Sequence, residues 1–262
     1  MQQKDLVPFF SITFLLTWGI AALYIFASDM MVPMFGNLTG THPLYYLAVY
    51  APGIAALLLV LHRGGFAGMR RFLSRLLLWR TSLYWYGLII FIVPLAFYVS
   101  GLFKPGAYEK LFPFASVLAY LQALFFMAIK GPVEEIGWRG FALPLLQRRM
   151  APIWAGLVLG VIWAFWHTPA FLLSGTVHSA WAYVPFFLGT VAISVIITPL
   201  FNSSRGSILL PALLHLQLIN PLWPDVQPYD SWVMLFVAAL VVWFNRTALF
   251  SPQSAITDVV PE

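Results

Sequence analysis

The chain of 262 residues is 61% hydrophobic and only 9% charged, which excludes an ordinary soluble domain, because such domains are about half apolar and about a quarter charged. Its net charge of +5 comes from Lys and Arg residues that lie between apolar segments, so the charge does not indicate nucleic acid as a partner. The sequence has no cysteine, which excludes disulfides, thiol nucleophiles and Cys-ligated zinc.

Apolar segments long enough to cross a bilayer recur along the sequence, since about 20 apolar residues cover about 30 Å of hydrocarbon. They predict an all-α polytopic membrane protein with about eight transmembrane helices. We expect a single helical domain over residues 1–250, followed by a polar, disordered tail over 251–262. The predicted spans are 7–27, 43–62, 82–103, 114–147, 151–172, 181–201, 207–222 and 231–245.

The basic residues predict the orientation of these spans. If the N-terminus lies in the cytoplasm, ten of the 14 Lys and Arg residues fall on the cytoplasmic side. Because basic residues accumulate in cytoplasmic loops, both termini are expected there. We therefore expect a multi-pass protein of the cell (plasma) membrane, in a bacterium the inner or cytoplasmic membrane, with the lipid bilayer as its surroundings.

Residues 63–80, between the second and third spans, combine five arginines with several leucines and a tryptophan. This pattern predicts a basic interfacial helix on the inner leaflet. A solvated basic loop is the alternative.

The fourth span carries a cluster of charged residues. Gly131-Pro132 predicts a break, after which a new half-helix begins, with Glu134 and Glu135 in its first turn. Glu135 and Arg139 are four residues apart, an ion-pairing distance, whereas Glu134 points about 100° away around the helix. Glu134 is therefore a candidate base for activating water. A buried ion-pair network that only fixes helix packing is the alternative for these residues.

Two later spans each place a histidine among apolar residues. Trp163 and His167 are four residues apart on the fifth span, and His215 and Asn220 follow on the seventh. His178 falls in a loop, where we expect it to be solvated or interfacial. A lone intramembrane histidine is usually a hydrogen-bonded packing residue. Two of them together with a Glu-Glu-Arg cluster indicate a functional site near the middle of the bilayer.

These residues resemble the motifs of the CPBP (CAAX protease and bacteriocin-processing, or Abi) family of intramembrane proteases. Glu134-Glu135-x-x-x-Arg139 matches its Glu-Glu-x-x-x-Arg motif, and Trp163-x-x-x-His167 matches its aromatic-x-x-x-His motif with Trp where Phe is usual. The resemblance covers residues 115–222, approximately the C-terminal half of the chain.

The last family motif, His-x-x-x-Asn, is altered in this sequence. The fourth residue after His215 is Ile219, and the asparagine follows one position later as Asn220. On a regular helix Asn220 would point about 140° away from His215. A π-bulge or an unwound turn before Pro221 would bring the two side chains into alignment.

The resemblance implies an endopeptidase that cleaves a membrane-embedded or lipidated peptide or protein substrate. Glu134 would activate water with help from His167, and His215 and Asn220 would stabilise the oxyanion. Glu135, Arg139 and Trp163 would have supporting roles. Two cofactor alternatives follow: no cofactor in a glutamate-type protease, or zinc held by Glu134, His167 and His215 in a metalloprotease.

A non-catalytic membrane protein is the alternative function. The same charged residues are typical of a proton-coupled transporter, or of an immunity or scaffold protein that has lost turnover. The displaced Asn220 favours this alternative, and the absence of a recognisable inverted repeat counts against a transporter.

Overall fold

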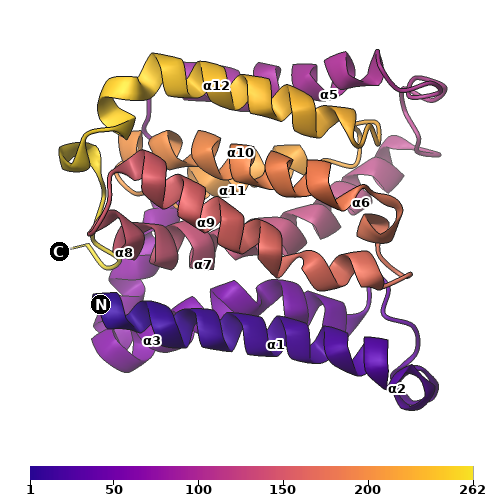
Figure 1. Cartoon of the computed structure of the whole chain (residues 1–262), viewed down its shortest axis with the longest axis horizontal. Coiled ribbons are helices and arrows are strands. Elements are labelled where there is room, and N and C mark those ends of the chain that lie inside the picture. The colour runs from indigo at the N-terminus through magenta and orange to yellow at the C-terminus, as the bar shows by residue number, and fades with distance from the viewer. Residues whose placement is uncertain (262) are drawn as a thin grey trace.

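A computed structural model describes residues 1–261, and these residues form helices and connecting loops without a β-strand. The helices pack side by side, and both ends of the chain lie at the same end of the bundle (Figure 1). The first half contains α1 (Leu6–Phe26), α2 (Ser28–Phe35), α3 (Pro43–Leu73), α4 (Leu83–Gly87), α5 (Val93–Gly101) and α6 (Val117–Lys130). The second half contains α7 (Glu134–Gly137), α8 (Leu143–Gln147), α9 (Pro152–Trp166), α10 (Tyr183–Ser203), α11 (Leu209–Leu218) and α12 (Tyr229–Leu249).

Within the described residues, seven helical segments are long and apolar enough to cross a membrane. They confirm the all-α polytopic fold. The eighth predicted span, 207–222, corresponds to α11, which has only ten residues. Pro221 cannot continue a helix and restricts the residue before it, which accounts for the early end of α11.

The predicted break in the fourth span is confirmed. The helix α6 ends at Lys130, a 3-10 turn covers Gly131–Val133, and α7 begins at Glu134. A π-helical turn over Trp138–Ala142 then leads into α8. The interruption places Glu134 and Glu135 in the first turn of a short, buried helix.

Glycines allow the helices around this break to approach closely. A side-chain Cβ at Gly137 would lie 2.4 Å from the backbone of Pro52 in α3. On α9, a Cβ at Gly160 would lie 2.9 Å from Ser194 of α10, and the Ser194 hydroxyl donates to the carbonyl of Gly156 at 2.9 Å. Small residues thus bring α3 and α10 against the elements that carry the candidate site.

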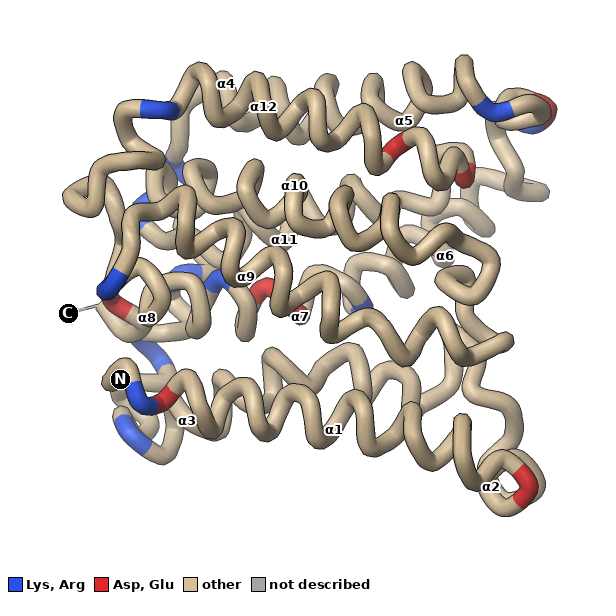
Figure 2. Tube along the Cα trace, in the orientation of Figure 1, with Lys and Arg blue, Asp and Glu red and all other residues tan. Residues whose placement is uncertain are grey.

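Lys and Arg residues gather at the end of the bundle that holds both termini (Figure 2). The predicted interfacial segment is only partly exposed there. Its Arg75 is 2% exposed and donates to the carbonyls of Gly140, Gly206 and Val259 at 2.7, 2.7 and 2.8 Å. The three carbonyl acceptors replace water as hydrogen-bond partners and so offset the cost of burying this arginine.

Up to Pro261, the C-terminal tail packs against the helices, whereas the sequence predicted a disordered segment. Val259 is 1% exposed and belongs to the main apolar core, and the Ile256 carbonyl accepts a hydrogen bond from Gln147 at 2.8 Å. Arg148 donates to the Thr257 carbonyl at 2.9 Å. The composition of the tail is polar, but its few apolar side chains and its backbone carbonyls find partners on α8 and its neighbours.

Candidate active site

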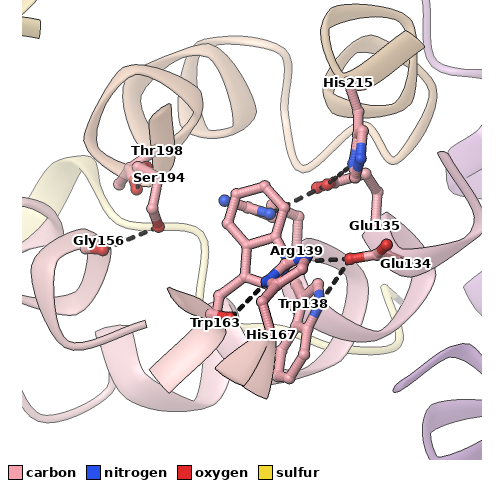
Figure 3. Close-up of polar contacts among 10 residues, drawn as sticks. All are labelled: Glu134, Glu135, Trp138, Arg139, Gly156, Trp163, His167, Ser194, Thr198 and His215. Atoms are coloured by element: carbon pink, nitrogen blue, oxygen red, sulfur yellow. Dashed lines mark hydrogen bonds and ion pairs between the residues drawn. The ribbon is translucent and has the colours of Figure 1, made fainter. Parts of the chain in front are cut away.

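A cavity of about 450 Å³ lies between the helices and is lined mainly by apolar side chains. Glu134, Trp163, His167, His215 and Asn220 all line it. The structure therefore brings five of the seven residues singled out by sequence to one cavity, from three separate segments of the chain. Figure 3 shows the polar contacts among most of these residues.

Glu134 is 4% exposed, and its two carboxylate oxygens have different surroundings. Its Oε2 accepts hydrogen bonds from the indole nitrogens of Trp163 at 2.8 Å and of Trp138 at 3.3 Å (Figure 3). Among the described residues, none donates a hydrogen bond to Oε1. One oxygen is thus fixed in place, while the other is left for a molecule in the cavity.

Glu135 forms the ion pair expected from its spacing with Arg139, at 3.0 Å between two fully buried side chains. The same Oε1 atom of Glu135 lies 2.7 Å from Nδ1 of His215. Because an ionised carboxylate only accepts hydrogen bonds, Nδ1 of His215 carries a proton in this pair. The second ring nitrogen, Nε2, is then the one available to a ligand.

Gly131 leaves space for that second nitrogen. A Cβ built on this glycine would stand 2.9 Å from Nε2 of His215 and 2.5 Å from the side chain of Ile219. Any larger residue at position 131 would have to displace the His215 ring or Ile219.

Trp163 contacts most members of the site. Beyond its hydrogen bond to Glu134, its carbonyl lies 2.8 Å from Nδ1 of His167, and its ring centroid is 5.8 Å from the His167 ring and 5.5 Å from the His215 ring. The guanidinium of Arg139 stacks 4.3 Å from the indole centroid. As a carbonyl can only accept, Nδ1 of His167 is the protonated nitrogen and Nε2 is left as an acceptor.

Asn220 lies beyond the end of α11, in an unwound turn, and still faces the cavity. Its side-chain oxygen accepts from the backbone N–H of Leu222 at 3.0 Å and from the Tyr120 hydroxyl at 3.4 Å, and its amide donates to Gln217 at 3.3 Å. The early helix end thus brings Asn220 to the cavity wall that His215 shares, while the asparagine also stabilises the turn.

Two residues of the site were missed by the sequence analysis. Trp138 holds Glu134 from the position four residues later, a spacing that was visible in the sequence. His178 was expected to be solvated or interfacial in a loop, but its ring lies 5.7 Å from the His167 ring and lines the cavity. No local pattern around His178 indicates this, because a loop folds over the cavity to bring it there.

The residues named for zinc do not form a metal site. Glu134, His167 and His215 share the cavity, but within residues 1–261 no group of three or more His, Cys, Asp or Glu side chains is arranged to hold a metal ion. The donor geometry therefore gives no support to the metalloprotease alternative.

Comparison with known proteins gives two matches in the region of the site. The family model for type II CAAX prenyl endopeptidase Rce1-like proteins matches residues 116–218. A curated relative named CAAX prenyl protease 2, from Methanococcus maripaludis, is 28% identical over 143 residues. Both matches point to the CAAX protease (CPBP) family, over the part of the chain that carries the site.

The match to the CAAX protease family is confined to part of the chain. The alignment with the Methanococcus protein covers 50% of this chain, and the chain spans about half, 52%, of the length of that relative. The family model includes Glu134, His167 and His215 but ends two residues before Asn220. The altered last motif therefore lies at the edge of what the CAAX protease model describes.

Proposed function

We propose that the chain is an intramembrane endopeptidase that hydrolyses a peptide bond of a membrane-embedded or lipidated substrate, with water activated by Glu134. The observation that carries this proposal is the arrangement of Glu134, with one oxygen held by two indoles and the other unpaired in a cavity that His167 and His215 also line. The family match supports the same reaction.

In the proposed reaction, Glu134 takes a proton from a water molecule through the unpaired oxygen. The hydroxide attacks the scissile carbonyl carbon, and the carbonyl oxygen takes up the negative charge. Glu134 then gives the proton to the departing amine as the carbon–nitrogen bond breaks, which balances the hydrolysis. His167, with Nε2 unprotonated, accepts a hydrogen bond from the same water and orients it.

His215 and Asn220 are the proposed donors to the oxyanion. Because Nδ1 of His215 already donates to Glu135, donation from Nε2 requires a doubly protonated ring. The Glu135 carboxylate at 2.7 Å stabilises that charge. The amide of Asn220 supplies the second donor. Donors held in place before the reaction act most strongly in surroundings that exclude water.

The test is the Glu134→Gln variant, which keeps the size of the side chain and removes its basicity. We expect cleavage of membrane-tethered peptides by the purified protein in liposomes, followed by mass spectrometry, to fall about 100- to 10,000-fold. Glu109→Gln, on an exposed loop, is the matched control and should cleave at the wild-type rate. A folded Glu134→Gln protein with full activity would overturn the proposal.

The same liposomes distinguish the alternative function. Proton-coupled flux that depends on Glu134, without any peptide cleavage by the wild-type protein, would identify a transporter in place of a protease.

A further inference from the structure

Arg75 joins three parts of the chain that are far apart in sequence. It is 2% exposed, and among the described residues its guanidinium donates only to backbone carbonyls. The acceptors are Gly140 and Gly206 at 2.7 Å each and Val259 at 2.8 Å. They lie 65, 131 and 184 residues from Arg75 along the chain. One buried side chain therefore fixes segments that no single helix connects.

The Gly140 carbonyl is available to Arg75 because its α-helical donor is missing. In an α-helix this carbonyl would accept from the N–H four residues later, and that residue is Pro144, which has no N–H. The backbone forms the π-helical turn Trp138–Ala142 at this point. The guanidinium of Arg75 supplies a donor and so fixes the turn that contains Arg139.

Arg75 also holds the residues that lead into α11. Its side chain donates to Gly206, which has a φ of 78°, a left-handed conformation that favours glycine. Its own carbonyl accepts from the backbone N–H of Ile208 at 3.1 Å. Between these two residues, the Ser207 hydroxyl donates to the Leu78 carbonyl at 2.5 Å. The start of α11 is thus bound to the segment around Arg75 at three consecutive positions.

The two elements that Arg75 joins meet again in the candidate site. Glu135 lies five residues before Gly140, which is about 8 Å along a helix. His215 lies six residues after the start of α11 at Leu209, about 9 Å along its axis. Between them, Oε1 of Glu135 and Nδ1 of His215 are 2.7 Å apart (Figure 3). The relative position of the π-helical turn and the start of α11 therefore determines this contact.

We propose that Arg75 is a positioning residue for the proposed reaction: by binding Gly140 and Gly206 together, it sets the distance between Glu135 and His215. The inference rests on the proposed function, in which Glu135 stabilises the charged His215 ring. Arg75 does not line the cavity, so it acts through the backbone and not on the substrate. A displacement of about 1 Å caused far from the reacting atoms can slow a reaction about 100-fold.

The first experiment measures steady-state cleavage by Arg75→Met in liposomes, well below the unfolding temperature of each variant. We expect kcat to fall about 10- to 100-fold with little change in KM, because the oxyanion donor is misplaced while the cavity is intact. Arg148→Met is the matched control. Arg148 also donates to two backbone carbonyls, Thr257 at 2.9 Å and Met1 at 2.7 Å, but these lie in the tail and at the N-terminus. It should cleave at the wild-type rate.

The conservative variant Arg75→Lys keeps the charge but lacks the planar fork that reaches both glycine carbonyls. We expect a smaller loss of kcat than in Arg75→Met. Wild-type kcat in a folded Arg75→Met protein, an equal loss in Arg148→Met, or a loss that lies wholly in KM would overturn the proposal. If Arg75→Met does not fold, wild-type kcat in Arg75→Lys would overturn it.

A second measurement needs no substrate and separates this inference from the proposed function. The proton on Nδ1 of His215, shared with a carboxylate, should give a resolved downfield NMR resonance, assigned by its loss in His215→Gln. We expect the resonance to shift or disappear in Arg75→Met, to shift less in Arg75→Lys, and to stay in Arg148→Met. An unchanged resonance in folded Arg75 variants would exclude the positioning role, whether or not the protein is a protease. A shifted resonance in a protein that cleaves no peptide would contradict the proposed function alone.

Discussion

Glu134 presents one oxygen to two tryptophans and the other to the cavity. The Trp163 indole, at 2.8 Å, is the closer of the two donors and also contacts both histidines. The orientation of the proposed base therefore depends on a residue that has no chemical step of its own in the proposed reaction.

Replacing Trp163 by Phe keeps an aromatic ring but removes this donor. We expect kcat to fall about tenfold with little change in KM, because the lost hydrogen bond goes to a charged acceptor. Steady-state kinetics of peptide cleavage measure the effect. Trp232→Phe, at a position 48% exposed, is the control. An equal loss in both variants would show that Trp163 acts through general stability.

The Glu135–Arg139 pair is predicted to contribute to the stability of the folded protein, and not to catalysis alone. Both side chains are fully buried, so Glu135→Gln would leave Arg139 as an uncompensated charge. We expect a destabilisation of about 3 kcal/mol, seen as a lower temperature of thermal unfolding in detergent. The double variant Glu135→Gln, Arg139→Met should recover part of this loss. If the double variant is as unstable as the single one, the pair does not set the stability.

At this scale the sequence predicted the residues that lie on one helix far better than those that meet across helices. The pairs Glu135–Arg139 and Trp163–His167 follow from four-residue spacing. The contact of His215 with Glu135 spans 80 residues, and the position of His178 depends on a folded loop. Periodicity carries no information about contacts of this kind.

Among the elements, α7 is the shortest helix of the site and is held by its crossing with α3. Gly137 lies at that crossing, 2.4 Å from Pro52 if it carried a Cβ. The position of both glutamates therefore depends on a glycine that makes no polar contact with them.

Gly137→Ala should destabilise the protein by about 1–3 kcal/mol, because the methyl group has no space against the backbone of α3. Gly19→Ala is the matched control, since a Cβ there meets nothing within 4 Å, and a helical alanine should be neutral or stabilising. Thermal unfolding of both variants in detergent measures the difference. Equal stability of the two would show that α3 moves freely away from α7.

The sequence predicted the type of each element well and its length less well. The break at Gly131-Pro132 followed from the properties of proline, whereas α11 was expected to span the membrane and has only ten residues. Apolar content does not distinguish a short buried helix from a spanning one. The order in the tail depends on acceptors and apolar contacts provided by α8 and the core.

In the whole molecule, the basic end of the bundle lies on one side of Glu134 and Glu135, and the cavity extends on the other side. The termini and most basic residues are at one end (Figure 2), whereas the cavity is lined on its far side by residues of the loops 36–42, 173–182 and 221–228. These loops lie at the end opposite the termini (Figure 1). We predict that the basic end is cytoplasmic.

The lack of natural cysteines allows a direct test of this orientation. Val177→Cys lies beside the cavity at a position 63% exposed, and Gln253→Cys lies in the exposed tail at the opposite end. In intact cells, a membrane-impermeant maleimide should label the first and not the second. The reverse pattern would place the cavity end in the cytoplasm.

A cavity that extends from Glu134 toward one end of the bundle makes the proposed reaction directional. Water would enter and the released fragment would leave on the same side, away from the termini. Cleavage would then act as a vectorial step: a peptide anchored in the bilayer would lose its end to the compartment beyond the membrane, with no separate transporter required.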